Sequence, residues 1–324
     1  MFLVAELGAS HGGSLKRALA LVDMAAEAGA DAIKLQTFSP DQMAVHYKIK
    51  SGAWKGRDLV ELYREAHTPK SWHPVLFQRA REKSLVAFSS PFHKHDVDFL
   101  ETLDCPIYKI ASPEIVDLEL ISLVAQTGKP IIMSTGGASR DEIKQAVKIA
   151  SRHCDDITLL HCVSQYPAAI EDTNLATMLE LQKYSCKVGL SDHSKDSLVA
   201  IMAATLGASC IEKHICIDGI GLDSGFAMNF DAFSSFVSGV RQASNAMGKV
   251  KFGQASEWRR SLYYARDIAK GEIITRDMLV TKRPAIGLSP AIIDDVIGTM
   301  SRGAVKHQPI SGNCKATNNT IATK

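Results

Sequence analysis

The chain has 324 residues, of which 46% are hydrophobic and 22% charged, a composition that excludes bulk disorder. Its 37 basic and 35 acidic residues give a formal net charge of +2, which argues against a dedicated nucleic-acid or membrane-surface binder. The seven cysteines include no C-x-x-C pair, so we expect reduced thiols and a cytoplasmic protein rather than a disulfide framework or a zinc knot. The N-terminus lacks the basic leader of a signal peptide.

Short apolar runs alternate with helical patterns over the first 247 residues. The runs lack a clean period of two, which is typical of strands buried on both faces. The expected strands are 2–6, 32–37, 85–90, 106–112, 130–135, 157–162, 187–192 and 209–215, and the expected helices are 15–28, 69–83, 94–103, 117–127, 139–152, 173–183, 195–206 and 231–247. Eight strand–helix units predict an α/β fold, a closed (β/α)8 TIM barrel. A doubly wound sheet is the alternative, but no glycine-rich dinucleotide turn supports it.

The first helix carries boundary signals. Ser14 is the expected N-cap, because its hydroxyl can accept from free backbone N–H groups. The predicted buried face consists of Leu15, Leu19, Val22 and Ala26. Glycines that we expect in the left-handed conformation follow this helix and two later ones, at Gly29, Gly128 and Gly207.

One connection is much longer than an ordinary loop of about 2–6 residues. Residues 38–68 separate the second strand from its helix, and such insertions often form lids or substrate walls. After the barrel at 1–250 we expect a linker at 251–261, a small β-rich domain at 262–312 and a frayed tail at 313–324. Within the small domain, Lys270-Gly271 predicts a turn.

Polar residues lie at the carboxyl ends of all eight expected strands, where barrels of this kind form their active sites. Burying a polar group without a partner costs about 1–3 kcal/mol, so eight polar strand ends around one mouth predict a binding site. These residues are Glu6, Lys34, Gln36, Ser89, Ser90, Lys109, Ser112, Glu114, Ser134, Thr135, His161, Ser164, Ser191, Asp192, His193, Glu212 and His214.

Two histidines end neighbouring strands. His193 follows the seventh strand and His214 ends the eighth, so their imidazoles can share a divalent ion such as Mn²⁺, Zn²⁺ or Fe²⁺. Asp192 and Glu212 could support that ion or bind it directly. Two structural histidines are the alternative, and His11 could either join the site or stabilise its own loop.

Lysines also lie near the strand ends. Lys34 and Lys109 are accompanied by serines, a combination that suits a phosphate or a carboxylate. A Schiff-base lysine, as in class I aldolases, is the other reading of such a residue. Lys213 alternates away from His214, so we expect it to face the helices and to be structural.

The motifs together resemble the sialic acid synthase family, whose members condense phosphoenolpyruvate with an amino sugar to form nonulosonic acids. The matching stretches are AELGASHGG (5–13), AGADAIKLQT (28–37), FSSPF (88–92), YKIASPE (108–114), GKPIIMSTGG (128–137), LLHCVSQYPA (159–168), VGLSDHS (188–194) and LGASCIEKH (206–214). Segments 260–275 and 282–290 resemble the antifreeze-like (SAF) domain of the same enzymes. Within the family, segments 54–72 and 221–228 are most similar to the pseudaminic acid synthase branch.

The resemblance implies roles for residues already selected. Phosphoenolpyruvate would be held by Lys34, Ser90, Lys109, Ser112, Ser134 and Ser191, and Mn²⁺ or Mg²⁺ by His193 and His214. The sugar and proton-transfer side would comprise Glu6, Glu114, Ser164, Tyr166 and Asp223, with Glu114 the first choice of catalytic carboxylate and Glu6 the second. Arg283 would reach from one subunit into the barrel of another and grip the acyl group of the sugar, which implies a domain-swapped homodimer.

The implied reaction is the metal-dependent condensation of phosphoenolpyruvate, water and 2,4-diacetamido-2,4,6-trideoxy-β-L-altropyranose, with phosphate released by C–O cleavage. One alternative is an N-acetylneuraminate or legionaminate synthase acting on a sugar related to N-acetylmannosamine. The remaining alternatives are a class I aldolase or lyase and a non-enzymatic carbohydrate-binding protein.

Overall fold

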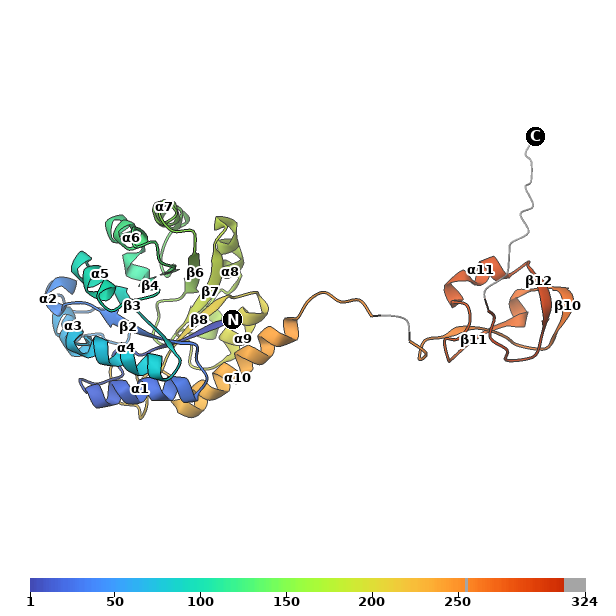
Figure 1. Ribbon diagram of the computed structural model, residues 1–324, viewed down its shortest axis with the longest axis horizontal. Coiled ribbons are helices and arrows are strands. Elements are labelled where there is room, and N and C mark those ends of the chain that lie inside the picture. Colours follow the sequence, from blue (N-terminus) through green and yellow to red (C-terminus); the bar gives the residue numbers. More distant parts are fainter. Residues whose placement is uncertain (254–255, 312–324) are drawn as a thin grey trace, which may run out of the picture. The chain divides into compact units, whose positions relative to one another are not determined.

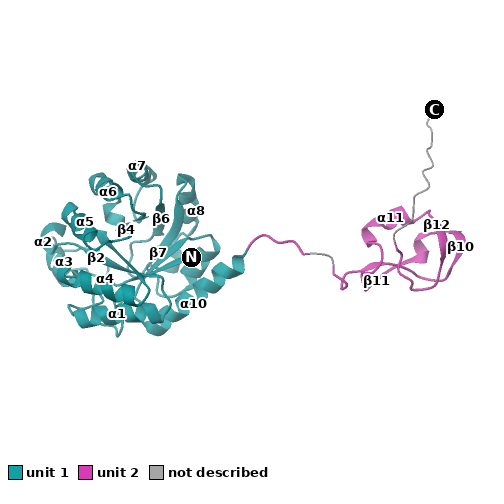
Figure 2. Cartoon of the chain, in the orientation of Figure 1, with its two compact units in different colours: residues 1–248 teal, residues 249–324 magenta. Residues whose placement is uncertain are grey.

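The computed structural model describes residues 1–253 and 256–311. The chain divides into two compact units, Met1–Gly248 and Lys249–Lys324 (Figure 2). The tail expected at 313–324 lies outside the described residues. In the part of the chain that is described, no helix is long and apolar enough to cross a membrane.

The first unit is a closed barrel of eight parallel strands, paired in sequence order and surrounded by helices (Figure 1). Its strands are β1 (Phe2–Glu6), β2 (Ala32–Thr37), β3 (Val86–Pro91), β4 (Tyr108–Ile110), β5 (Ile131–Ser134), β6 (Ile157–Cys162), β7 (Lys187–Asp192) and β8 (Cys210–His214). The pairing of β8 with β1 closes the barrel and confirms the predicted TIM barrel over a doubly wound sheet.

The helices alternate with the strands, and most lie within a few residues of their expected positions. They are α1 (Leu15–Glu27), α2 (Pro40–Met43), α3 (Leu59–Ala66), α4 (His73–Glu82), α5 (Lys94–Glu101), α6 (Leu118–Ala125), α7 (Arg140–Ala150), α8 (Ala176–Leu181), α9 (Leu198–Thr205) and α10 (Phe230–Met247). Apolar residues of the strands and of the inner helix faces form one continuous core.

The boundaries predicted for α1 are confirmed, but its buried face is rotated from the predicted one. Ser14 caps the helix by accepting from the backbone N–H of Arg17, and Gly29 has a φ of +85°. The fully buried side chains are Ala18, Leu21, Val22 and Ala25, whereas Leu15, Leu19 and Ala26 lie at the edge of the core. Small alanines at the centre of the contact let the helix approach the strands closely.

The insertion at 38–68 contains α2, α3 and a short antiparallel hairpin (47–59). Backbone bonds join Leu59 N to Tyr47 O at 2.9 Å and Ile49 N to Arg57 O at 2.9 Å, and Lys48 pairs with Asp58. The carboxylate of Asp58 accepts from the first backbone N–H groups of α3 and so fixes the hairpin to that helix.

The second unit contains two antiparallel strand pairs around a small core of its own. Strand β9 (Ser261–Tyr264) pairs with β11 (Leu279–Lys282), and β10 (Ile268–Ile273) pairs with β12 (Met300–Ala304). Residues Ile293–Val296 form α11. The turn predicted at Lys270-Gly271 is wrong, because both residues lie inside β10 at a shift of register, where Gly271 has a φ of +87°.

Candidate active site

A cavity of about 470 Å³ opens at the carboxyl ends of the barrel strands. Every residue of the barrel to which the family resemblance gives a role lines it, namely Glu6, Lys34, Ser90, Lys109, Ser112, Glu114, Ser134, Ser164, Tyr166, Ser191, His193, His214 and Asp223. Four other strand-end residues predicted at the mouth do not line it, because their side chains bond to neighbouring elements instead: Ser89 to Thr37, Thr135 to the carbonyl of Leu160, His161 to the carbonyl of Thr173, and Asp192 to Lys213. Arg283 belongs to the second unit. The convergence follows from closure, because the eight carboxyl ends of a parallel barrel meet at one mouth.

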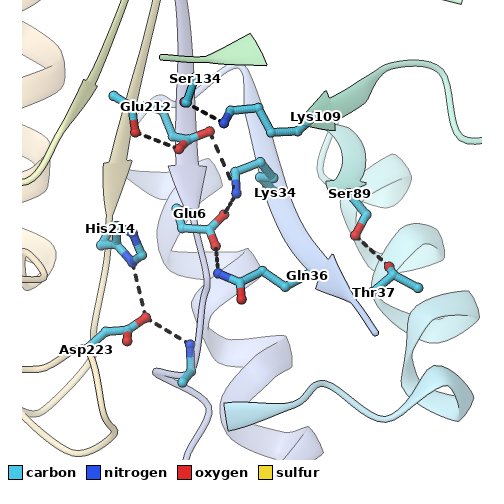
Figure 3. A network of polar contacts seen from close by, with 12 residues as sticks. Glu6, Lys34, Gln36, Thr37, Ser89, Lys109, Ser134, Glu212, His214 and Asp223 are labelled. Carbon is cyan, nitrogen blue, oxygen red and sulfur yellow. Dashed lines mark hydrogen bonds and ion pairs between the residues drawn. The ribbon is translucent and has the colours of Figure 1, made fainter. Parts of the chain in front are cut away.

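The floor of the cavity is a network of buried charges (Figure 3). Lys34 Nζ lies 2.7 Å from Glu6 Oε2 and 3.8 Å from Glu212 Oε2. Gln36 donates to the other oxygen of Glu6 at 2.7 Å, so both oxygens of that carboxylate have partners. Lys109 donates to Ser134 Oγ at 2.6 Å and to the carbonyl of Ile110 at 3.2 Å.

These charges determine one another's ionisation. Burial alone would favour the neutral form of Glu212, but the charges of Lys109 and Lys34 hold its pKa well below the usual range. Burial alone would lower the pKa of Lys34, but the negative charges of Glu212 and Glu6 outweigh this effect and raise it. At Lys109 burial prevails, reinforced by the nearby charge of Lys34, and its pKa is lowered. A bound anion would stabilise the charged form of Lys109, so the floor suits an anionic ligand.

Several hydroxyl groups are free to donate to such an anion. Ser134 accepts from Lys109 and Ser112 accepts from the backbone N–H of Gly136 at 3.1 Å, which leaves the proton of each hydroxyl available. Ser90 Oγ is buried and has no hydrogen-bond partner among the described residues. Ser191 differs, because its hydroxyl donates to Glu212 at 2.9 Å.

The two histidines lie side by side, with ring centroids 5.4 Å apart. Nδ1 of His193 lies 2.9 Å from the carbonyl oxygen of Val163, and Nδ1 of His214 lies 3.1 Å from Asp223 Oδ2. Because both partners are acceptors, the protons reside on Nδ1 and the Nε2 atoms remain open. Metal-binding histidines have this arrangement. No group of three or more His, Cys, Asp or Glu side chains that could hold a metal ion occurs in the described ranges.

Asp223 holds His214 in place. Its Oδ2 also accepts from the backbone N–H of Ala9 at 2.9 Å. Gly8 makes this approach possible, because it has a φ of +45° and a Cβ there would lie 2.0 Å from Asp223 Oδ2. Asp223, which the family resemblance assigns to the sugar side, lines the cavity and also contacts His214.

Glu114 differs from the paired carboxylates of the floor. It lies in the turn Ser112–Val116 that follows β4, and its Oε2 is buried without a hydrogen-bond partner among the described residues. Burial raises the pKa of Glu114 to about 7. A carboxyl group with this pKa can hold or release a proton near neutral pH.

Two polar residues near the mouth have structural roles. Lys213 faces away from the cavity as predicted, and its Nζ lies 2.9 Å from Asp192 Oδ2 in a fully buried ion pair. His11 accepts from the backbone N–H of Gly13 at 3.1 Å and packs edge-on against Trp72. These contacts agree with the alternative in which His11 stabilises its own loop.

Sequence reasoning missed the apolar side of the cavity. Trp54, Tyr63 and Phe226 line it, together with the thiol-bearing Cys162. The available signal was the length of the insertion at 38–68, which was expected to form a substrate wall. Nothing in the sequence indicated which of its residues would face the cavity.

Comparison with known proteins gives the family. The NeuB family model matches residues 21–252, and the SAF domain model matches residues 259–313. The chain belongs to the NeuB family, as its motifs indicated.

Curated relatives are similar over nearly their full length. The pseudaminic acid synthase of Campylobacter jejuni subsp. jejuni serotype O:2 is 40% identical, with 94% of each chain covered. That of Helicobacter pylori is 41% identical, with 96% of each covered. The N,N'-diacetyllegionaminic acid synthase of the same Campylobacter is 32% identical, with 92% of this chain and 95% of the relative covered.

Solved structures of related proteins are similar to this chain in fold as well as in sequence. The N-acetylneuraminic acid synthetase of Leptospira borgpetersenii serovar Hardjo-bovis, in complex with citrate, has a TM-score of 0.72 and 32% identity, and the match covers 78% of this chain and 87% of that one. A spore coat polysaccharide biosynthesis protein of Bacillus subtilis has a TM-score of 0.66 and 30% identity, with 95% and 92% covered.

The raised pKa of Glu114 predicts a pH-dependent effect on stability. A carboxyl whose pKa is raised by folding costs no stability below its unfolded pKa, and the cost grows until the pH passes the folded value. The variant Glu114→Gln should therefore be more stable than the wild type by roughly 1–3 kcal/mol at about pH 8. This difference should shrink steadily between about pH 7 and 4.5. Thermal denaturation across this range measures it.

The control is Glu27→Gln, which removes an exposed carboxylate at the end of α1. It corrects for the loss of one negative charge. A stability difference for Glu114→Gln that stays constant with pH would show that the carboxyl is not held neutral by its surroundings.

Proposed function

We propose that the protein acts as a pseudaminic acid synthase. It condenses phosphoenolpyruvate with 2,4-diacetamido-2,4,6-trideoxy-β-L-altropyranose and water, and releases phosphate by C–O cleavage. The supporting observation is a single cavity that combines an anion-binding floor with a histidine pair. The chain that carries it is 40% identical to a pseudaminic acid synthase across 94% of both sequences.

The floor binds the phosphate and carboxylate of phosphoenolpyruvate. Lys34 and Lys109 supply positive charge, and the free hydroxyl protons of Ser90, Ser112 and Ser134 supply directed hydrogen bonds. Ser191 contributes by fixing Glu212, which in turn holds Lys34 in its charged form. The enol is thereby held deep in the barrel with its reactive carbon directed toward the histidines.

His193 and His214 would hold a divalent ion, Mn²⁺ or Mg²⁺. When bound, it supplies a Lewis acid for the carbonyl oxygen of the open-chain sugar. Val163 and Asp223 keep both rings oriented by accepting their Nδ1 protons. Tyr166 packs against His193 with ring centroids 4.2 Å apart and restricts the movement of that ring.

Carbon–carbon bond formation turns the aldehyde oxygen into an alkoxide and creates positive charge at C2 of phosphoenolpyruvate. Water must then add at C2, and the proton that it releases finally neutralises the alkoxide. The added water loses a proton, and Glu114 accepts it, because one of its oxygens is unpartnered and its pKa is about 7. Glu6 is less suited, since both of its oxygens are engaged by Lys34 and Gln36. The tetrahedral product then expels phosphate by C–O cleavage.

We further propose that the enzyme is a cytoplasmic, domain-swapped homodimer. Arg283 of one subunit grips an acyl group of the sugar bound in the barrel of the other. The role of Arg283 was inferred from the resemblance of its segment to the SAF domain. The match of residues 259–313 to the SAF domain model supports that resemblance. The described cysteines are all free thiols, which suits a reducing compartment.

The reaction is tested by phosphate release from phosphoenolpyruvate and Mn²⁺ with three sugars supplied separately. These are the altro sugar named above, its manno analogue derived from bacillosamine, and N-acetylmannosamine. The altro sugar should give a kcat/KM at least about 10-fold above the others. Preference for a manno sugar would make the protein a legionaminate or neuraminate synthase. Absence of phosphate release with all three sugars would favour the carbohydrate-binding alternative. A lysine adduct trapped by borohydride in the presence of pyruvate would favour the class I aldolase.

The metal site is tested by His214→Ala. Turnover should fall by about 10³-fold or more, because Lewis-acid stabilisation contributes several kcal/mol. EDTA should abolish wild-type activity and Mn²⁺ should restore it. His153→Ala, which removes an exposed histidine, is the control and should behave as the wild type. Normal metal binding and turnover by His214→Ala would remove that residue from the site.

The action of Arg283 in a second subunit is tested by complementation. Chains with Arg283→Ala and chains with His214→Ala should each be nearly inactive. Co-expressed, they should recover about a quarter of wild-type activity, because half of the dimers are mixed and each has one intact site. Chains carrying both substitutions should not complement Arg283→Ala. Light scattering should give twice 35.2 kDa. A monomer, or no recovery on mixing, would contradict the proposal.

A further inference from the structure

The mouth of the cavity has an apolar side that the proposed chemistry leaves unused. Tyr47, Ile49 and Leu59 of the hairpin (47–59) line it, as does Trp54 at the turn of the hairpin. Phe226, which follows β8, lies on this side too. We name these five residues the apolar wall. It contrasts with the charged floor, which lies among the strand ends.

The hairpin presents this wall in a fixed orientation. Tyr47 and Ile49 are two residues apart on an extended strand and therefore share one face. Backbone bonds within the turn join Gly56 N to Ile49 O at 2.8 Å and Arg57 N to Trp54 O at 3.1 Å. An ion pair between Arg57 and Glu65 ties the hairpin to α3.

Aromatic contacts connect the histidine pair to the wall. Phe226 lies 5.0 Å from His214 between ring centroids, and Tyr166 lies 4.9 Å from Phe226. The ring of Trp54 lies 5.5 Å from that of Tyr166 and 6.3 Å from that of Phe226. Trp54 is therefore separated from each histidine by one aromatic ring, Tyr166 on the side of His193 and Phe226 on the side of His214.

We propose that the apolar wall, with Trp54 at its centre, binds the C6 methyl group of the sugar and selects 6-deoxy over 6-hydroxy substrates. The inference rests on the proposed function, which places the aldehyde carbon at the histidine pair. A methyl group gains contact with the rings of the wall. A hydroxymethyl group at the same place would exchange its bonds to water for apolar surroundings, which is unfavourable.

The experiment compares the altro sugar with its 6-hydroxy counterpart, 2,4-diacetamido-2,4-dideoxy-altrose. The wild type should prefer the 6-deoxy sugar in kcat/KM by roughly 10- to 100-fold, the range in which an apolar pocket discriminates against an added hydroxyl. In Trp54→Ala the ratio of the two kcat/KM values should fall toward one, mainly because kcat/KM for the 6-deoxy sugar decreases. The KM for phosphoenolpyruvate should stay within about twofold, because the floor is unchanged.

Two further variants separate selection from a structural effect. Trp54→Phe keeps an aromatic ring and should retain most of the preference. Ile49→Ser introduces a hydroxyl into the wall and should also shift the preference toward the 6-hydroxy sugar. Lys55→Ala, which alters an exposed residue of the same turn, is the control and should match the wild type.

The outcomes distinguish the two proposals. If the wild type releases no phosphate with either sugar, the proposed function itself fails. If the wild type is active but both Trp54→Ala and Ile49→Ser keep its sugar preference, the apolar wall does not select the methyl group. If Trp54→Ala does not fold, Ile49→Ser decides, because it changes the wall by a smaller amount.

Discussion

Closure of the barrel between β8 and β1 is the constraint on which the site depends. In that register Glu6 pairs with His214 on one side and with Lys34 of β2 on the other. The three residues come from distant parts of the chain, and closure alone places a carboxylate between a histidine and a lysine. The charges of the floor are compatible with burial only because this register pairs them, since an isolated charge would lose its hydration without compensation.

The period of two along each strand divides the polar residues between two environments. Glu212 and His214 point into the cavity, whereas Lys213 between them points outward and pairs with Asp192. The same β7–β8 contact thus carries a buried ion pair behind the histidines. Removing one member of such a pair leaves an uncompensated charge, which costs about 3–5 kcal/mol. The outer pair therefore stabilises the position of the inner histidine without lining the cavity.

The sequence predicted the barrel and most members of its polar mouth, because strand ends are local features and closure brings them together. It predicted the alternation of Lys213 and His214 for the same reason. It failed where the outcome depends on packing between distant segments. The buried face of α1 is set by how closely the helix approaches the strands, and Trp54 reaches the cavity only through the fold of the hairpin. The hydrogen bonds of Asp223 to His214 and to the backbone N–H of Ala9 were likewise not predicted, and the second spans 214 residues of sequence.

The charged floor and the apolar wall differ in how well they tolerate amino-acid substitutions. A substitution in the floor alters a buried network in which each charge maintains the ionisation of its neighbours, so the chemistry and the stability change together. The hairpin lies outside the continuous core of the barrel and is held by its own backbone bonds and by α3. Its side chains can therefore vary in size and polarity at little cost to the barrel. Under the proposed function, such a division would let one reaction centre serve different sugars, because the floor proposed to hold phosphoenolpyruvate is separate from the wall proposed to meet the far end of the sugar.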